Sequence, residues 1–220
     1  MGRRCKEEGA GKIQNNMSEK LQPQPENQEQ PEREVIVDIG TGNNPAYQWS
    51  EKLLEKVEQG AKYICIDCEE EDVLKNPKVQ GEDWVVGDIR KLPIKDKSAD
   101  QIWLLNVFSD FKNLPDIKED GTKSYNMGLT DVFEGLERTL KDNGRIVIGE
   151  TYTPSRGAAG GLAEADFSDC GLEKKVYKGE ELDKFFEDNK IPIEYARDYE
   201  EERPEHKQPY FMELTKKKEE

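Results

Sequence analysis

The sequence predicts an α/β protein with a doubly wound, mostly parallel β-sheet. From residue 35 to residue 149, short apolar runs alternate with segments of helical periodicity. Alternating β and α units of this kind form a parallel sheet that is covered by helices. A turn with two glycines, Gly40 and Gly42, follows the first apolar run, and in such folds the first β–α turn is where the backbone comes close to a ligand.

Five strands are expected in this part of the chain. Each is an apolar run rich in β-branched or aromatic residues, as is typical of strands that are buried on both faces. They comprise residues 35–37, 62–67, 84–88, 101–108 and 145–149.

Three segments have the spacing of amphipathic helices, namely residues 49–58, 129–140 and 179–189. The clearest is 129–140, whose apolar residues recur at intervals of three and four and so form one stripe. After it, Gly144 suits the left-handed residue that commonly ends a helix. The stripe comprises Leu129, Val132, Phe133, Leu136 and Leu140.

The end of the chain predicts an antiparallel strand. Residues 191–197 and 210–216 alternate between apolar and polar side chains. The segment between them contains Pro204 and Pro209 and is too irregular for a crossover helix. We therefore expect a β-hairpin here, which would add one antiparallel strand to the sheet.

Residues 1–33 differ from the rest of the chain in composition. They are rich in Gln, Asn, Glu and Pro and have few apolar side chains, so burial cannot offset the entropy of ordering them. We expect a disordered tail at 1–33 and one folded domain at 34–220. The first 16 residues lack the apolar segment of a secretory signal, and no apolar run approaches the ~18 residues that span a bilayer, so a cytoplasmic location without membrane contact is expected.

The charge is confined to the predicted domain. The chain carries a net charge of −15, whereas residues 1–33 contain six basic and six acidic side chains, so the whole excess lies on residues 34–220. A surface of that sign repels phosphate backbones. Nucleic acid is therefore expected less than a small-molecule or protein partner.

The cysteines do not indicate a metal site. Cys65 and Cys68 form one C-x-x-C pair, with no second pair and with a single histidine, His206, far along the chain. A structural zinc ion needs about four ligands. Two thiols at the end of a strand, with no metal, are the expected arrangement.

The first turn favours a ligand with positive charge. Its pattern, Gly40-x-Gly42-x-x-Pro45, lacks the third glycine that lets a helix pack closely over a pyrophosphate. Asp38 would also lie near that anion. Both features disfavour an NAD-type oxidoreductase, which remains an alternative, and they suit S-adenosylmethionine, which carries an ammonium and a sulfonium group.

Residues 34–150, and more loosely 175–216, resemble the class I methyltransferases that use S-adenosylmethionine, nearest the small-molecule branch with a compact Rossmann-like domain. "VDIGTGNNP" resembles the first motif of that family, although Asn44 replaces its usual last glycine. "ICIDCEEED", "VVGDIRKLPIKDKSADQIWLL" and "LERTLKDNGRIVI" resemble its next segments. The resemblance implies a seven-stranded sheet whose last strand is antiparallel, in agreement with the alternation at the end of the chain.

The resemblance also implies a set of cofactor-binding residues. Asp38, Gly40, Thr41 and Gly42 would surround the methionine part, and Asp67 would accept hydrogen bonds from both ribose hydroxyls. The adenine ring would be held by Asp88 and Ile89, and Asn106 would face the cofactor at the end of the fourth strand.

The chemistry of the acidic residues supports these roles. One carboxylate can accept two hydrogen bonds from a vicinal diol, and such charge-assisted bonds are strong. Asp67 lies 25 residues after Gly42, near the roughly 20 that separate a glycine turn from a ribose-binding acid. The alternatives are a helix-capping or solvated acid for Asp67 and a turn acid for Asp88, and a turn is the expected role of Asp100.

The methyl acceptor and a general base are not identified by the sequence. Asn106, Asp110, Glu150 and Tyr152 end the fourth and fifth strands, yet no diagnostic motif surrounds them, so no catalytic residue is assigned. Residues 109–128 and 151–175 are long connections at the edge where substrate loops arise, and ordinary surface loops are the alternative. A member of the family that has lost catalysis and serves as a binding module remains the alternative to an enzyme.

Overall fold

The computed structural model describes residues 32–42, 44–69, 82–108, 116–117, 123–124, 127–151, 159–193, 195 and 209–218. The chain divides into two compact units, Met1–Glu32 and Arg33–Glu220, and the described helices and strands all lie in the second. The tail predicted at 1–33 lies outside the described residues except for Glu32 and Arg33, so its disorder stays a prediction.

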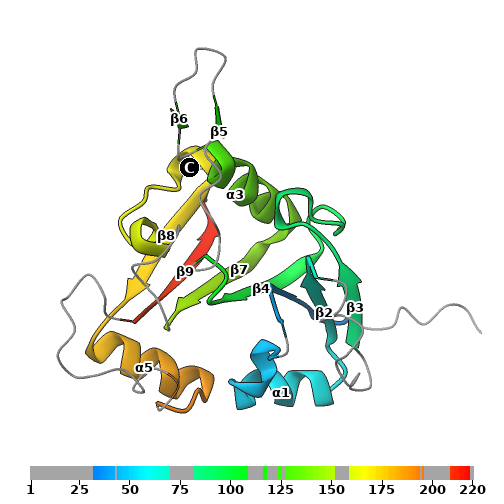
Figure 1. The fold of residues 1–220 in the computed structure, drawn as a ribbon. Helices are drawn as coiled ribbons and strands as arrows, with labels where there is room; N and C mark the ends of the chain where they lie inside the picture. The colour runs from blue at the N-terminus through cyan, green and yellow to red at the C-terminus, as the bar shows by residue number, and fades with distance from the viewer. Residues whose placement is uncertain are drawn as a thin grey trace, which may run out of the picture. The chain divides into compact units, whose positions relative to one another are not determined.

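The second unit is built on a seven-stranded sheet (Figure 1) with the order β3-β2-β1-β4-β7-β9-β8. The pairs β1–β2, β1–β4, β2–β3 and β4–β7 are parallel, while β9 is antiparallel to both β7 and β8. The predicted class, a doubly wound and mostly parallel sheet with its last strand antiparallel, is confirmed. The strands are β1 (Val35–Ile39), β2 (Lys62–Asp67), β3 (Glu82–Val86), β4 (Ala99–Leu105), β7 (Leu140–Glu150), β8 (Leu172–Tyr177) and β9 (Tyr210–Lys216).

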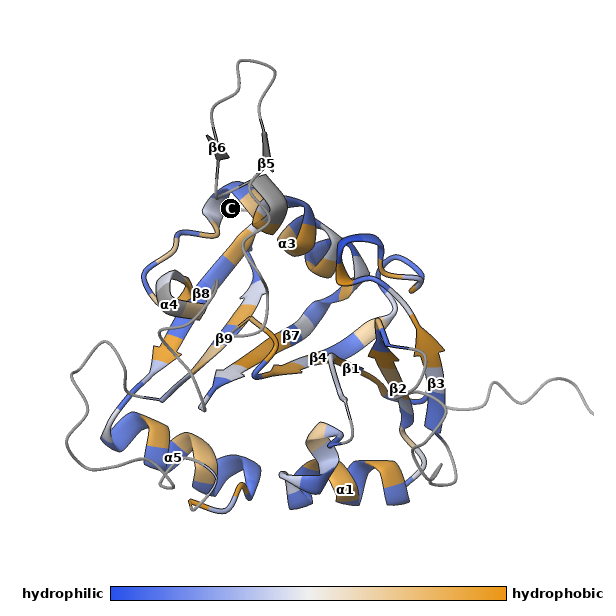
Figure 2. Ribbon diagram, viewed as in Figure 1, coloured by the Kyte–Doolittle hydropathy of each residue, from blue (hydrophilic) through white to orange (hydrophobic). Residues whose placement is uncertain are grey.

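Helices cover both faces of this sheet. On one face lie α1 (Glu51–Glu58) and α5 (Glu180–Asn189), and on the other α3 (Met127–Thr139) and α4 (Ala159–Leu162). Figure 2 shows apolar residues along the strands and on one side of α1, α3 and α5. The remaining elements are the 3-10 turns η1 (Ala46–Gln48), η2 (Ile89–Lys91) and η3 (Ser168–Cys170), and a separate antiparallel pair of β5 (Asp116–Ile117) and β6 (Lys123–Ser124).

The alternation of β1 divides the core into two layers. Ile36 packs toward α1 and α5, whereas Val37 and Ile39 pack toward α3. Such alternation places successive side chains on opposite faces of the sheet. At the start of α1, the hydroxyl of Ser50 accepts a hydrogen bond from the Leu53 amide over 3.3 Å and so caps the helix.

The predicted C-terminal hairpin is wrong in one strand. Besides β7, the strand that pairs with β9 is β8, which begins within the segment 151–175 that was expected to be a connection. Residues 191–193 form no strand but follow the end of α5, and Tyr195 is helical. Because β8 is an edge strand of the sheet, it tolerates charged side chains that a central strand would not, and its short sequence therefore lacks a clear apolar pattern.

The role predicted for Gly144 is also wrong. Its φ is not positive, and it lies inside β7 rather than at a helix end. A Cβ at this position would lie 2.6 Å from Leu140 Cδ1 and 3.0 Å from the Ala99 carbonyl oxygen. Close packing of the start of β7 against β4, and not backbone conformation, is what requires glycine here.

Within the described ranges, no helix is long and apolar enough to cross a lipid bilayer. The same ranges contain no group of three or more His, Cys, Asp or Glu side chains that could hold a metal ion.

Candidate functional site

All the predicted cofactor-binding residues lie at the carboxyl ends of four neighbouring strands. Asp38 belongs to β1, Asp67 ends β2, and Asn106 follows β4. The strand order reverses between β1 and β4, which is where ligands bind in open α/β sheets. Two glycines and a threonine follow β1 (Gly40, Thr41, Gly42), and an acid and an isoleucine follow β3 (Asp88, Ile89).

The first turn requires glycine at Gly40 for two reasons. The residue has a φ of 70°, in the left-handed region, and a Cβ would lie 2.7 Å from Val107 Cγ2. Its amide donates to the Ile66 carbonyl oxygen over 2.8 Å, which holds the turn against β2. Gly42 is also left-handed, with a φ of 48°. The turn therefore brings bare backbone to the carboxyl edge of the sheet.

Asp38 holds the segment after this turn through hydrogen bonds to its carboxylate. The residue is only 2% exposed. Oδ2 accepts one hydrogen bond from the Ala46 amide over 2.6 Å and another from the Tyr63 hydroxyl over 2.7 Å. Burial raises the pKa of Asp38 to about 7, although both hydrogen bonds act in the opposite direction. Asp38 thus joins the end of β1 to the start of η1.

Asp67 joins the first turn to the end of β2. Its Oδ2 accepts from the Gly42 amide over 2.8 Å, and its Oδ1 accepts from the Glu69 amide over 3.0 Å. A carboxylate has about four acceptor positions, so both oxygens retain capacity for hydroxyl donors. The arrangement suits an acid that binds a diol beside a glycine turn.

Thr41 supplies a direct test of whether a polar ligand fits this turn. The residue is 6% exposed, and its hydroxyl has no hydrogen-bond partner within the described part of the chain. A buried polar group without a partner costs free energy. A polar ligand at this turn would supply such a partner, and the methionine part of S-adenosylmethionine carries polar groups that suit this role.

Asp88 acts as a turn residue, which the sequence predicted as the alternative to adenine binding. Its Oδ1 accepts from the Arg90 amide over 2.9 Å and so caps η2. The Arg90 guanidinium also forms a two-point ion pair with this carboxylate, and these hydrogen bonds hold the pKa of Asp88 below its usual value. Ile89 is 9% exposed and packs into the layer beneath α3. Their contact with adenine stays a prediction.

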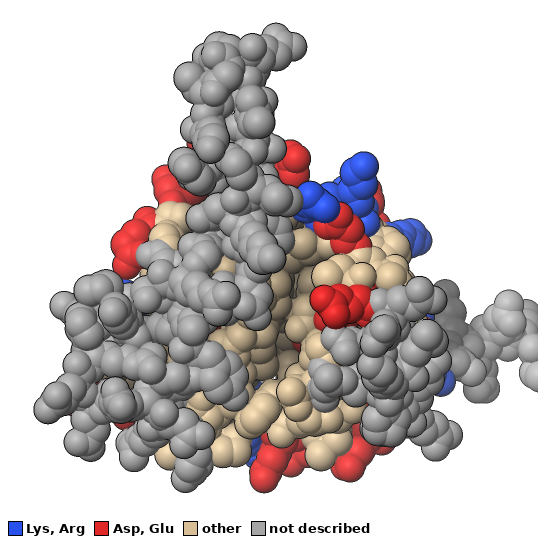
Figure 3. Space-filling view, viewed as in Figure 1, with Lys and Arg blue, Asp and Glu red and all other residues tan. Residues whose placement is uncertain are grey.

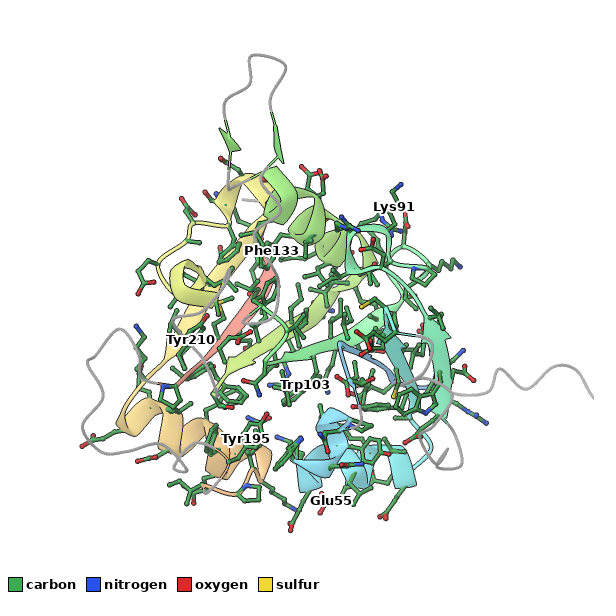
Figure 4. All side chains as sticks on the ribbon, viewed as in Figure 1. Glu55, Lys91, Trp103, Phe133, Tyr195 and Tyr210 are labelled. Carbon is green, nitrogen blue, oxygen red and sulfur yellow. The ribbon has the colours of Figure 1, made fainter. Side chains whose placement is uncertain are left out.

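Asn106 ties together three segments at the end of β4. Its φ of 57° is left-handed, a conformation that asparagine tolerates better than most residues. Oδ1 accepts from both the amide and the hydroxyl of Thr151, at 2.8 and 3.2 Å, and Nδ2 donates to the Tyr195 hydroxyl over 3.1 Å. The Tyr195 ring packs on Trp49, with ring centroids 4.4 Å apart, and Figure 4 shows Tyr195 beyond α5 on the side toward α1.

The other strand-end residues fall into different places. Glu150 is fully buried, and its Oε1 accepts from the Phe108 amide over 2.9 Å. Asp110 and Tyr152 lie outside the described residues. Asp100 is the second residue of β4 and lies at the opposite edge, where its Oδ2 accepts from the Val35 amide over 2.7 Å and from Lys141 Nζ over 3.1 Å. Asp100 is therefore structural.

Three side chains of the site were not identified from the sequence. Tyr63, Thr151 and Tyr195 each hydrogen-bond a predicted site residue, Asp38 for the first and Asn106 for the other two. The apolar pattern predicted Tyr63 and Tyr195 on strands, and only the fold shows which polar groups their hydroxyls reach. Figure 3 shows the molecule hollowed in the middle of the face drawn in Figure 1, with uncharged residues beside the hollow and acidic side chains nearby.

Several solved structures share this fold. A comparison with curated proteins gave no match. The YcgJ protein from Bacillus subtilis has 15% identity and a TM-score of 0.53, over 86% of this chain and 94% of that one. A TehB-like S-adenosylmethionine-dependent methyltransferase from Corynebacterium glutamicum has 20% identity and a TM-score of 0.50, over 86% and 83%. A third, an S-adenosylmethionine-dependent methyltransferase from Aquifex aeolicus, has 15% identity and a TM-score of 0.51, over 83% and 82%.

The family is shown by the sequence itself. Residues 37–148 match the family described as the methyltransferase domain, which is 112 of the 220 residues. The matched range begins in β1 and ends in β7, and it contains every predicted cofactor-binding residue. The chain therefore belongs to the methyltransferase-domain family of class I enzymes, whose cofactor is S-adenosylmethionine.

Proposed function

We propose that this methyltransferase transfers the methyl group of S-adenosylmethionine to a small-molecule or protein acceptor rather than to nucleic acid. The observation that carries the cofactor assignment is the 2.8 Å hydrogen bond from the Gly42 amide to Asp67 Oδ2. It brings the ribose-binding candidate to the turn that would hold the methionine part. The proposed site consists of Asp38, Gly40, Thr41, Gly42, Asp67, Asp88, Ile89 and Asn106.

Asp67 is suited to the ribose because of where its hydrogen bonds come from. Two backbone amides, of Gly42 and Glu69, donate to its two oxygens, so the carboxylate is already oriented before a ligand arrives. Two hydroxyls of a ribose would add charge-assisted hydrogen bonds to oxygens that retain acceptor capacity. Preorganisation of this kind lowers the entropy that binding must overcome.

Asp38 and Thr41 are suited to the methionine part. The described residues place no lysine or arginine in an ion pair with Asp38, which is buried. A cationic ligand above it would be attracted by its carboxylate. The Thr41 hydroxyl is a buried polar atom that has no hydrogen-bond partner among the described residues.

Adenine recognition by Asp88 requires its carboxylate to accept hydrogen bonds from both Arg90 and the adenine amino group. The Arg90 ion pair is half exposed, with side-chain exposures of 49% and 43%, so the guanidinium is held only at the surface. Exposed pairs of this kind contribute about 1 kcal/mol or less. A ring that packs on Ile89 could therefore displace Arg90 from one carboxylate oxygen at low cost.

The chemistry demands little of the chain beyond positioning. When bound, S-adenosylmethionine supplies the methyl group and a sulfonium leaving group. The residues at the ends of β1, β2 and β4 would fix its orientation, and alignment of the reacting atoms supplies much of the rate. Glu150 serves the Phe108 amide and is fully buried, so we assign it a structural role and name no general base.

The charge of the chain supports an acceptor other than nucleic acid. The net charge of −15 lies on residues 34–220, and phosphate backbones bind through basic surfaces. Figure 3 shows a few basic side chains on the drawn face, near acidic ones. Arg90 belongs to η2 and is paired with Asp88, and Arg138 belongs to α3 and is paired with Asp96.

Two experiments test this proposal in sequence. Titration calorimetry with S-adenosylmethionine and with NADH measures which cofactor binds, and we expect only the first to do so. Incubation with a labelled methyl donor and separate pools of metabolites, proteins, DNA and RNA then identifies the acceptor class. Transfer to nucleic acid alone would contradict the acceptor class, and binding without transfer to any pool would favour a non-catalytic module.

A further inference from the structure

Tyr63 is a fully buried residue of β2 that lies beneath the first turn. Its hydroxyl donates to Asp38 Oδ2 over 2.7 Å, the same oxygen that accepts from the Ala46 amide. We propose that Tyr63 is a positioning residue for the cofactor. Its hydroxyl orients the Asp38 carboxylate and stabilises the ionised form, which is the form that would bind a cationic cofactor, so that cofactor binding is coupled to the loss of a proton from Asp38. The inference rests on the proposed cofactor site.

Tyr63 also packs against the segment that follows the glycine turn. Its ring meets the Tyr47 ring of η1 edge to face, with centroids 5.2 Å apart and an interplanar angle of 78°. Tyr47 follows Ala46, whose amide Asp38 holds. Tyr63 thus contacts both the acid and the segment that the acid fastens. Edge-to-face contact at this distance is a favourable arrangement for two aromatic rings.

The surroundings of Asp38 are acidic, so the hydrogen bonds from Ala46 and Tyr63 are what favours its ionised form. Asp67 of β2 and Glu82 of β3 act on Asp38 as like charges. Glu82 is 8% exposed, and its Oε2 accepts from the Trp84 indole over 3.2 Å. Two further titratable groups face this cluster, the Tyr47 phenol and the buried Cys65 thiol. Burial and the two acids favour the protonated form of Asp38, whereas the Ala46 amide and the Tyr63 hydroxyl favour the ionised form.

A cationic ligand shifts this balance. The ammonium and sulfonium groups of S-adenosylmethionine would favour the ionised carboxylate, because an opposite charge nearby lowers the pKa of an acid. Near pH 7 the free protein holds a fraction of a proton on Asp38, and binding should release it. By linkage, affinity should fall as the pH decreases through the pKa of Asp38 in the free protein.

Removal of the Tyr63 hydroxyl should shift the pH dependence of cofactor affinity to higher pH. Tyr63→Phe deletes a donor to the ionised carboxylate, so the pKa of Asp38 in the free protein rises further. The affinity midpoint should move to higher pH. The loss of affinity should be about three- to tenfold near pH 7 and should shrink toward about pH 8.5, where Asp38 is ionised in both proteins.

The test is calorimetry with S-adenosylmethionine between about pH 6 and about pH 8.5, in two buffers of different ionisation enthalpy at each pH. The difference between buffers gives the number of protons released. The proteins are the unmodified chain, Tyr63→Phe, Asp38→Asn and Tyr210→Phe. Asp38→Asn keeps an oxygen acceptor but cannot titrate, so its profile reports the titration of the ligand's own amine.

Tyr210→Phe is the matched control. Tyr210 is 3% exposed, and its hydroxyl donates to the Ala159 carbonyl oxygen over 2.8 Å. It lies on β9 beneath α4, in the other core layer (Figure 4). Its loss removes the same kind of group from a similarly buried place without touching Asp38. We expect its affinity midpoint and proton release to equal those of the unmodified chain.

A second measurement keeps the inference testable if Tyr63→Phe does not fold. Carbon-detected NMR of the Asp38 carboxyl in the unmodified chain should show its pKa decrease when S-adenosylmethionine is added. If the pKa of Asp38 did not change on binding, or if Tyr63→Phe had the same affinity midpoint as the unmodified chain, the inference would be overturned. Binding of S-adenosylmethionine in that case would still support the proposed site. A chain that binds no S-adenosylmethionine would overturn both.

Discussion

The Gly42 amide donates a 2.8 Å hydrogen bond to Asp67 Oδ2, and this bond joins two strand ends that lie side by side in the sheet. The two residues are 25 positions apart in the sequence. The bond exists because β1 and β2 are parallel and so end at the same edge. It fixes the distance between the turn proposed to hold the methionine part and the acid proposed to hold the ribose.

Replacement of Gly40 should destabilise the protein more than replacement of another left-handed glycine. In Gly40→Ala the new methyl group would meet Val107 at 2.7 Å, in addition to the strain of a φ of 70°. We expect a loss of about 2–5 kcal/mol in the free energy of unfolding, from about 1–2 kcal/mol for the backbone strain and about 1–3 kcal/mol for the steric overlap.

Gly60→Ala is the matched control for this change. Gly60 has a φ of 96° and nothing within 4 Å of a Cβ, so only the backbone term applies. Urea denaturation of both variants measures the difference. Equal destabilisation would show that Val107 moves aside freely and that close packing at Gly40 is unimportant.

Asp38 should make the stability of the protein fall as the pH rises. Its pKa is about 7 in the folded protein, whereas the ordinary value, which applies to the unfolded chain, is 3.8. Between these values the folded protein holds a proton that the unfolded chain has lost. The stabilisation is complete below the lower pKa and is lost as the pH rises through the higher one.

Asp38→Asn removes this titration while it keeps an acceptor for Ala46 and Tyr63. Relative to this variant, we expect the unmodified chain to lose about 4 kcal/mol of unfolding free energy between about pH 4 and about pH 8. Denaturation by urea at several pH values gives both curves. Parallel curves would mean that Asp38 is ionised in the folded protein over this whole pH range and would contradict the raised pKa.

Asn106→Ala should weaken the site by releasing two strand ends and Tyr195. The change removes the hydrogen bonds to Thr151 and Tyr195 and leaves alanine at a φ of 57°. We expect a loss of about 2–3 kcal/mol in stability. Asn106→Gly tolerates the backbone but not the hydrogen bonds, so it should recover only about 1 kcal/mol of this loss. Full recovery in thermal melts would show that the side-chain bonds contribute nothing.

The chain should not be retained by bulk DNA or RNA at physiological salt. The net charge of −15 falls on residues 34–220, and non-specific binding depends on basic side chains that displace counterions. Chromatography on immobilised DNA and RNA at several salt concentrations tests this expectation. Strong retention that weakens steeply with salt would show a local basic surface and would reopen nucleic acid as an acceptor.

The central part of the fold could be predicted because its strands are buried on both faces. The runs in β1, β2, β4 and β7 are apolar for that reason, and the helices between them show one stripe each. The edge strand β8 could not be predicted, because Lys174 and Lys175 interrupt its pattern. The alternation at 191–197 was misleading, since Ile191 and Tyr195 are buried by packing after α5 and not by a strand.

The site could be predicted only in part. The glycine turn and the acids after β1 and β2 are local features of the sequence, and parallel pairing places them together. The hydrogen bonds of Tyr63 and Tyr195 depend on which side chains face each other across elements. Periodicity indicates that such residues are buried but not which polar groups they reach.

The most direct test of the account is the affinity for S-adenosylmethionine of the unmodified chain, Asp67→Ala and Asp100→Ala, each checked first by circular dichroism. Asp67 lies at the proposed ribose site, whereas Asp100 holds Val35 and Lys141 at the opposite edge. We expect Asp67→Ala to bind at least about tenfold more weakly, since each charge-assisted hydrogen bond is worth about 1.5–3 kcal/mol. Asp100→Ala should lose stability but keep its affinity. Equal affinities for the two variants, or an unchanged affinity in Asp67→Ala, would contradict the proposed cofactor site.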